Sequence, residues 1–424
     1  MAQDDVQKDQ EIQGIKLMVN YDYLYDKSYY GKELYEDHRR DYNLYWRVIP
    51  NGIVLPNDLS RGDISGGLMD EECNYIDGSG LHRGEGKWDD ISGETATELD
   101  EDIVFLGAWP QIWGHCLTDN IRRLWVLNNE EFMSRYGHLR FVYVPLFNMN
   151  LDGNFRELLD IIGAGKISLE PVTSITRFRN IILPDECFWM EDDGTRFFSR
   201  EYVDIIDQIR KYGEEHFTES KDKKVYFTYR RFPSYRTIGE KYLERFFSRL
   251  GYKIVSPEKY SFTEQLNILL NCEEYASTVG SISHNGVFLR DGAKMYLIPR
   301  AYFIPEYQLA LDQVHDIDIT YIDSSLSFYV NPKRQWEGPF NLIISHELEE
   351  CLGQVVNFKE SKLDFHIYRY LGFVINNKTD LLDYYRSVYR KYLPVEPKWD
   401  GRENLITKLF RVPKIRNLIV LLRR

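Results

Sequence analysis

Apolar and polar positions alternate most regularly between residues 221 and 299. Apolar residues that recur every four positions predict a helix from Ile238 to Leu250, followed by Gly251 where a helix-ending glycine belongs. Ser261 and Glu264 form a capping box, which predicts a second helix. Short apolar runs predict strands at 224–229, 252–255, 275–279 and 294–298. Strands that alternate with helices indicate a parallel sheet with right-handed crossovers.

The flanking regions give weaker patterns. Residues 47–55, 103–106 and 141–144 read as strands, and residues 107–113 as a loop. A helix is expected from about His115, because the apolar residues Leu117, Ile121, Leu124, Trp125 and Leu127 follow it. Residues 314–321 alternate in the manner of an edge strand, and residues 324–392 are mostly helical in pattern.

Composition limits the class of protein. The 424 residues correspond to about three units of 150 residues, or two larger ones. An aromatic content of 15% argues against a disordered chain, and a net charge of −13 (53 − 66) argues against nucleic-acid binding. The five cysteines are widely spaced, no segment resembles a signal peptide, and no apolar run would span a membrane. We therefore expect a reducing, cytoplasmic location.

The segment 401–424 differs from the rest because it carries seven basic residues and one acid. Ile415, Leu418, Ile419 and Leu422 have helical spacing, so the segment predicts a basic amphipathic end. It would suit the anionic inner face of the plasma membrane. The alternative is a last helix that packs on the N-terminal part of the chain.

The first candidate chemical group is Gly114-His115, with Asp119 four residues after the histidine. On a helix, His115 and Asp119 would lie on one face near its N-terminus. A carboxylate in that place can take a proton from an attacking hydroxyl. The alternative is an acid that only complements the helix dipole.

The second group is the arginine-rich stretch after the 224–229 strand, which contains Arg230, Arg231 and Arg236. Guanidinium groups bind phosphate oxygens bidentately and stay charged, so they could neutralise a diphosphate leaving group without a metal. The alternative is a solvated basic loop.

The third group follows the 275–279 strand and contains Gly280, Ser281, Ser283, His284 and Asn285. Backbone N–H groups of such a turn can hold a phosphate, and the side chains of His284 and Asn285 can hydrogen-bond a pyrophosphate or a sugar. The alternative is an ordinary turn between a strand and a helix.

Two patterns associated with metals are incomplete. The stretch 345–350 resembles the His-Glu-x-x-His motif, but Glu350 stands where the second histidine is needed. Asp316 and Asp318 have the spacing of an Asp-x-Asp motif, but they lie within the expected edge strand. We therefore predict no metal site.

Taken together, the groups resemble the family 61 glycosyltransferases, chiefly the bacterial branch found with capsule and surface-polysaccharide genes. The resemblance covers about residues 100–325. The family pattern is Gly-His-x-x-x-Asp, a strand followed by arginines and an acid, Ser-Phe-x-Glu-Gln, and a glycine-rich loop that ends in Asn. The matching residues are Gly114, His115, Asp119, Arg230, Arg236, Glu240, Ser261, Phe262, Glu264, Gln265, Gly280, Asn285 and Gly292.

This resemblance implies an α/β, GT-B-like fold in which two Rossmann-like domains face a cleft and C-terminal helices cross back to the first domain. Residues 1–210 would form the acceptor-side domain, residues 211–325 the nucleotide-sugar domain, and residues 326–424 the C-terminal helices and tail. It also implies inversion at the anomeric carbon without a required metal or other cofactor.

Within this scheme Asp119 is the expected general base, with His115 as the residue that orients it or as the base itself. The donor diphosphate would be bound by Arg230, Arg231, Arg236, Gly280, Ser281, Ser283, His284, Asn285 and Glu264. The expected partners are a nucleotide-sugar donor and a glycan acceptor, which includes a polyprenyl-linked one. The alternative function is a catalytically inactive GT-B scaffold that binds glycan.

Overall fold

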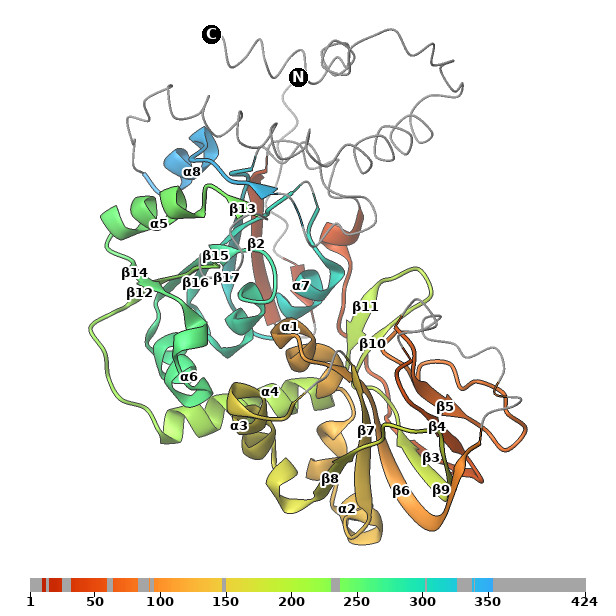
Figure 1. Cartoon of the computed structure of the whole chain (residues 1–424). Coiled ribbons are helices and arrows are strands. Elements are labelled where there is room, and N and C mark those ends of the chain that lie inside the picture. The colour runs from red at the N-terminus through yellow and green to blue at the C-terminus, as the bar shows by residue number, and fades with distance from the viewer. Residues whose placement is uncertain are drawn as a thin grey trace, which may run out of the picture.

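The computed structural model describes residues 10–12, 15–24, 32–58, 64–82, 91, 95–146, 150–229, 237–301, 303–325, 338 and 340–353. Within these residues two seven-stranded sheets, each with helices packed around it, form the two lobes of the molecule (Figure 1). The expectation of a mixed α/β protein with parallel strands is confirmed. None of the helices described is long and apolar enough to cross a bilayer.

The C-terminal sheet has the strand order β1-β2-β17-β16-β15-β12-β14, and every pair from β2 to β14 is parallel. The four strands predicted in this region are confirmed as β12 (Lys224–Phe227), β14 (Lys253–Val255), β15 (Glu274–Thr278) and β16 (Lys294–Ile298). The next strand of the sheet is β17 (Asp318–Ile322). The connecting helices are α5 (Glu240–Arg249) and α6 (Phe262–Asn271), and α6 begins with the predicted capping box at Ser261.

The expectation of an edge strand at 314–321 is wrong. β17 lies inside the sheet, because β2 (Ile15–Tyr23) pairs with it in parallel and β1 (Gln10–Ile12) continues beyond. The buried Tyr321 side chain is consistent with an inner strand. A segment from the start of the chain thus completes the C-terminal sheet, which no local pattern could reveal.

The N-terminal sheet is mixed, with β6, β7, β8 and β9 parallel and β3, β4 and β5 antiparallel. Its strands are β3 (Trp46–Pro50), β4 (Ile53–Leu55), β5 (Gly67–Met69), β6 (Thr97–Pro110), β7 (Arg140–Leu146), β8 (Ser168–Pro171) and β9 (Thr176–Pro184). The predicted strand 47–55 is split by a turn at Asn51. β6 continues through Pro110, so most of the loop expected at 107–113 is strand.

The remaining elements cover the sheets or join them. They are the 3-10 turn η2 (Lys32–Tyr35), α1 (Trp113–His115), α2 (Glu130–Tyr136), α3 (Gly153–Ile162), the hairpin strands β10 (Phe188–Met190) and β11 (Arg196–Phe198), α4 (Arg200–Glu215), the short strands β13 (Thr237–Ile238) and β18 (Phe340–Asn341), α7 (Glu306–Leu311) and α8 (His346–Cys351). Ser345, which was part of the incomplete metal motif, caps α8 by accepting a hydrogen bond from Leu348 N.

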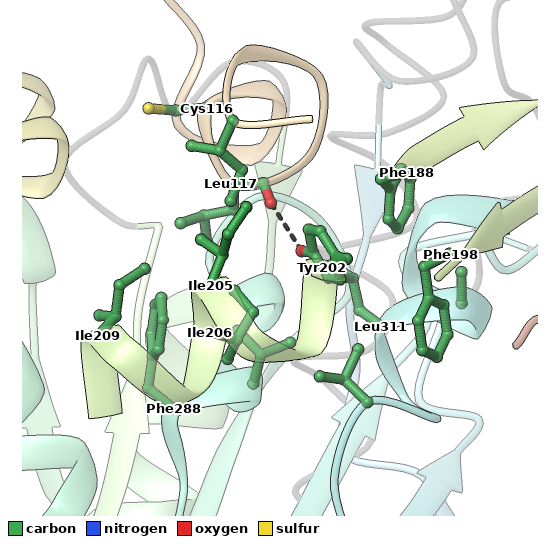
Figure 2. Packing of buried hydrophobic residues seen from close by; sticks show 14 of the residues in the cluster. Cys116, Leu117, Phe188, Phe198, Tyr202, Ile205, Ile206, Ile209, Phe288 and Leu311 are labelled. Atoms are coloured by element: carbon green, nitrogen blue, oxygen red, sulfur yellow. Dashed lines mark hydrogen bonds between the residues drawn. The ribbon is translucent and has the colours of Figure 1, made fainter. Parts of the chain in front are cut away.

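Helix α4 links the two lobes through one apolar core. Its buried face, which includes Tyr202 and Ile206, packs against three segments that carry functional side chains: Leu117 after α1, Phe288 after β15, and Leu311 on α7 (Figure 2). The Tyr202 hydroxyl donates a 2.7 Å hydrogen bond to the carbonyl of Leu117. Segments from both halves of the chain are therefore held on a common support.

Candidate active site

The segment after β6 is not the regular helix that the sequence suggested. α1 is a single turn, residues Cys116–Asn120 form a π-helical turn (η4), and Leu124–Asn128 form a 3-10 turn. π-helical turns are rare and occur frequently at functional sites. The apolar side chains still face the core as expected, since Leu117, Ile121 and Leu124 are fully buried. Across this irregular segment, His115 and Asp119 are in direct contact.

Asp119 lies at the centre of a hydrogen-bonded cluster. Its Oδ2 atom is 2.7 Å from Nδ1 of His115 and 2.9 Å from the hydroxyl of Thr118. The hydroxyl of Tyr307 lies 3.0 and 3.2 Å from the two carboxylate oxygens, and Arg122 Nη1 lies 3.4 Å from Oδ1. The Asp119 side chain is 1% exposed, whereas that of His115 is 24% exposed. Of these two groups, only the imidazole is open to solvent.

The surroundings keep Asp119 ionised. Burial alone would raise its pKa, but the hydrogen bond from His115, the charges that His115 and His82 carry when protonated, and the charge of Arg196 lower the pKa far below its ordinary value. A carboxylate accepts hydrogen bonds only, so Nδ1 of His115 carries the shared hydrogen. In the neutral imidazole, Nε2 is then the atom that can accept a proton.

Arg122, three residues after Asp119, holds a distant loop in place. Arg122 donates to the carbonyls of Gly80 and Leu81, at 2.6 and 2.8 Å. The next residue in that loop, His82, places Nε2 2.8 Å from the Tyr307 hydroxyl and 3.8 Å from Asp119 Oδ1. Buried Arg122 thus positions His82 beside the His115–Asp119 pair.

Tyr307 joins the cluster from the C-terminal half of the chain. Its ring is stacked on Phe188 at a centroid distance of 6.1 Å, and the Arg196 guanidinium lies 3.9 Å from its centroid. Burial and the nearby charge of Asp119 raise the pKa of Tyr307 well above its ordinary value, so its hydroxyl stays protonated. The hydroxyl is therefore a fixed donor to Asp119.

The first and third candidate groups meet in the structure. A Cβ atom placed on Gly114 would lie 2.8 Å from Ser281 Oγ and 3.0 Å from His284 Nδ1. Beside it, Trp113 Nε1 donates a 2.9 Å hydrogen bond to Oδ1 of Asn285. The glycine that precedes His115 is thus the point where the 280–285 turn packs against α1.

Most polar groups of the 280–285 turn are used within the fold. Ser283 Oγ interacts with both Gly280 and Gln308, and the amide of Asn285 bonds Trp113 and the carbonyl of Ile282. The N–H groups of Gly280, Ile282 and Ser283 also have partners within the protein. Ser281 is the half-exposed member of the set.

His284 is buried near His115, and its ring centroid lies 6.3 Å from that of Tyr307. Burial, with a smaller contribution from the charge of His115, lowers the pKa of His284 to about 4. It is therefore neutral at physiological pH and contributes no charge to the site.

The remaining expected donor residues are less informative. Arg230, Arg231 and Arg236 lie outside the described residues, as does the tail 401–424. The Glu264 carboxylate accepts a hydrogen bond from Ser261 N in the capping box, so its observed contact is structural. Glu240 is buried behind β12, where it accepts a 2.8 Å hydrogen bond from Tyr226, and burial raises its pKa to about 6.

Three residues of the cluster have ligand types that suit a metal. One atom each from His82, His115 and Asp119 lie within 4.8 Å of one another, and two imidazoles with a carboxylate are ligands that zinc accepts. However, Arg122 Nη1 is 3.4 Å from the same carboxylate, and Arg196 adds positive charge. These guanidinium groups oppose a dication, and His115 and Asp119 are already joined by a hydrogen bond.

Two open grooves lie elsewhere on the surface. One, of 340 Å³, runs along α6 and includes Lys253, Glu264 and Asn267, and the other, of 650 Å³, includes Asp152, Arg156 and Tyr212 between α3 and α4. Neither is lined by His115, Asp119 or the 280–285 turn. The volume of a groove therefore does not identify the site around His115 and Asp119.

The sequence reasoning missed His82, Arg122, Arg196 and Tyr307. Arg122 had a usable signal, because it lies one helical turn after Asp119. His82, Arg196 and Tyr307 come from segments far from residue 119, and only the tertiary fold brings them together.

Residues 113–296 of the chain match the family model described as Glycosyltransferase 61. The matched segment begins at Trp113, directly before Gly114 and His115, and it includes the 280–285 turn. No curated protein matches the chain significantly.

Proposed function

From the premise that this chain is a glycosyltransferase with a family 61 domain, we propose that it is an inverting, metal-independent enzyme that transfers a sugar from a nucleotide-sugar donor. In this proposal the two lobes form a GT-B arrangement, with the donor on the C-terminal lobe and the acceptor on the N-terminal lobe. The family match argues against the alternative of an inactive glycan-binding scaffold.

One observation carries the proposal: the half-exposed His115 is hydrogen-bonded to a buried, ionised Asp119 at the junction with the 280–285 turn. Because Gly114 has no side chain, Ser281 and His284 approach it closely, and the imidazole of His115 therefore lies close to the carboxyl edge of the C-terminal sheet. In parallel α/β sheets this edge is where nucleotides bind. A proton acceptor and a nucleotide-binding edge therefore lie next to each other.

We assign the general base to His115 and a positioning role to Asp119. Asp119 is enclosed by Thr118, Tyr307 and Arg122, and its low pKa makes it a poor proton acceptor. An imidazole whose Nδ1–H is held by a carboxylate can accept a proton at Nε2, and the carboxylate stabilises the imidazolium that results. His115 fits this role because its side chain is open.

In the proposed reaction, the acceptor hydroxyl loses its proton to His115 on one side of the sugar, and the diphosphate leaves from the other side. Nε2 of His115 takes the proton of an acceptor hydroxyl, the hydroxyl oxygen bonds C1 of the donor sugar, and the bond from C1 to the diphosphate breaks. Attack from the face opposite the leaving group inverts the anomeric centre. Positive charge near the departing diphosphate stabilises the transition state.

The biological setting of the proposal is bacterial capsule or surface-polysaccharide synthesis in the cytoplasm. The acceptor would be a glycan, including a polyprenyl-linked one, and the basic segment 401–424 would contact the anionic inner face of the plasma membrane. The resemblance to the bacterial branch of the family is what supports this setting. Truncation after Gly401 that leaves liposome binding unchanged would contradict the membrane contact.

The purified chain should be incubated with UDP-, GDP-, CMP- and dTDP-sugars and candidate glycan acceptors, and the products followed by mass spectrometry. We expect transfer from one donor class, with full activity in EDTA. NMR of the product should show an anomeric configuration opposite to that of the donor. Retention of configuration, loss of activity in EDTA, or no transfer with any donor would contradict the proposal.

A further inference from the structure

The C-terminal sheet contains one topological switch point. The chain passes from β12 to β14 on one side and then returns to place β15 on the other side of β12. The loops after β12 and β15 therefore leave the sheet in opposite directions. In sheets of this kind, ligands bind in the crevice that such loops leave at the carboxyl ends of the strands.

Arg300, which follows the carboxyl end of β16, reaches this switch point. Its guanidinium carbon lies 5.1 Å from the ring centroid of Tyr229, after β12, and 4.5 Å from that of Phe340, in β18. Planar guanidinium groups stack favourably on aromatic faces. The two rings thus fix the position of a cation that the sequence analysis did not select.

Gly280 is what allows the guanidinium to come close. A Cβ atom on this residue would lie 2.7 Å from Nη2 of Arg300 and 2.9 Å from the hydroxyl of Tyr229. Gly280 also has a φ of +146°, which L side chains rarely adopt. The backbone of the turn and the cation are therefore in direct contact, and any larger residue would separate them.

The turn itself offers few donors to an anion. The N–H groups of Gly280, Ile282 and Ser283 are hydrogen-bonded within the protein, and Ile282 N donates to the Tyr229 hydroxyl at 2.9 Å. An anion at the switch point therefore depends on side chains for most of its charge compensation. Burial lowers the pKa of Arg300, partly offset by Tyr229 and Glu240, yet a guanidinium stays charged at physiological pH.

We infer that Arg300 binds the diphosphate of the nucleotide-sugar donor at the switch point. A guanidinium carries five N–H groups in a planar fork, and phosphate oxygens can accept hydrogen bonds from two of them at once. This inference rests on the proposed function, and it adds a donor-binding residue beyond the 230–236 stretch. Ser281, half-exposed in the same turn, is the neighbouring hydroxyl.

The test is calorimetric titration of the full chain with UDP, GDP, ADP and dTDP, and with the corresponding nucleosides. Arg300→Gln should weaken binding of the diphosphate that the wild type prefers by about tenfold to a hundredfold. Binding of the nucleoside should be unchanged. Arg290→Gln is the matched control, because Arg290 lies 4.6 Å from the Phe217 ring at the opposite end of β16 and should behave as wild type.

The outcomes separate the two claims. If the wild type binds no nucleoside diphosphate, the proposed function is contradicted. If the wild type binds one and Arg300→Gln binds it equally well, only the role of Arg300 is overturned. If Arg300→Gln proves unfolded, Arg300→Lys replaces it, because lysine keeps the charge but lacks the planar fork. An unchanged affinity of folded Arg300→Lys for the nucleoside diphosphate would overturn the inference.

Discussion

The His115–Asp119 cluster and the switch point beneath Gly280 are built in different ways. At the cluster, a carboxylate with 1% exposure is surrounded by donors from Thr118, Tyr307 and Arg122, and its partner His115 is 24% exposed. At the switch point, the guanidinium of Arg300 is held by two aromatic rings.

The difference indicates two kinds of chemistry. A proton acceptor needs a fixed tautomer, which the enclosed carboxylate supplies by holding Nδ1 of His115. A leaving diphosphate needs positive charge that is already oriented before the reaction. Gly114 joins the two regions because its missing side chain admits Ser281 and His284. Variants of the cluster and then of the junction test this difference.

The largest effect is expected for His115→Ala, which removes the proposed base. Turnover should fall by about 10² to 10⁴-fold, because general-base catalysis contributes that much. Affinity for the nucleoside diphosphate should be unchanged, since the diphosphate site is separate. Transfer kinetics and calorimetry on the same preparation measure both quantities. The exposed His138→Ala is the control, and wild-type turnover in His115→Ala would remove this residue from the base role.

Asp119→Asn is expected to lower turnover by about 10² to 10³-fold while retaining the fold and nucleotide affinity. The amide has nearly the same shape, but it can present N–H to Nδ1 and so favour the wrong tautomer. The pH profile of kcat should change along with its magnitude. Asp102→Asn, at a surface pair with Arg179, is the matched control. An Asp119→Asn enzyme with an unchanged profile would contradict the positioning role.

Gly114→Ala should reduce turnover by about tenfold, through the contact with Ser281 and His284. Alanine is the better helix former, so a loss cannot come from helix propensity. In Gly165→Ala the added methyl would approach only the flexible ends of the Asp160 and Arg156 side chains, and activity should stay normal. A fully active Gly114→Ala enzyme would mean that the junction tolerates displacement.

The smallest effect concerns stability alone. Burial raises the pKa of Asp312 to about 7, so the folded state keeps a proton that the unfolded chain releases near pH 4. This contribution is fully present below about pH 4 and is lost as the pH rises through 7, with a slope of at most about 1.4 kcal/mol per pH unit.

Urea unfolding at pH 5 and pH 8 measures this slope directly. Asp312→Asn should lose less stability over that interval than the wild type, because the amide does not titrate. The exposed Asp316→Asn should behave as the wild type. Equal slopes in Asp312→Asn and the wild type would show that Asp312 does not hold the proton.

The sequence predicted the C-terminal strands well because each element there is specified locally. The capping box at Ser261 and the glycine after α5 are contained within a few residues. The inner position of β17 escaped prediction, since it depends on pairing with β2, about 300 residues earlier in the chain. The π-helical turn at Cys116 also escaped, because its apolar residues fit a regular helix equally well.

At the site, the pattern found the pair His115 and Asp119 and the 280–285 turn, which lie together. It did not determine which member of the pair is open, because exposure depends on Tyr307 and on the loop that Arg122 holds. Arg300 gave no pattern at all, since its role arises from where β16 lies beside β15 in the sheet.

A double-mutant cycle on turnover tests the central claim most directly, with His115→Ala, Asp119→Asn and the double variant measured under saturating donor and acceptor. If Asp119 acts through His115, the double variant should be no slower than His115→Ala alone. Losses that multiply, or a His115→Ala enzyme that remains faster than Asp119→Asn, would contradict the assignment of His115 as the base.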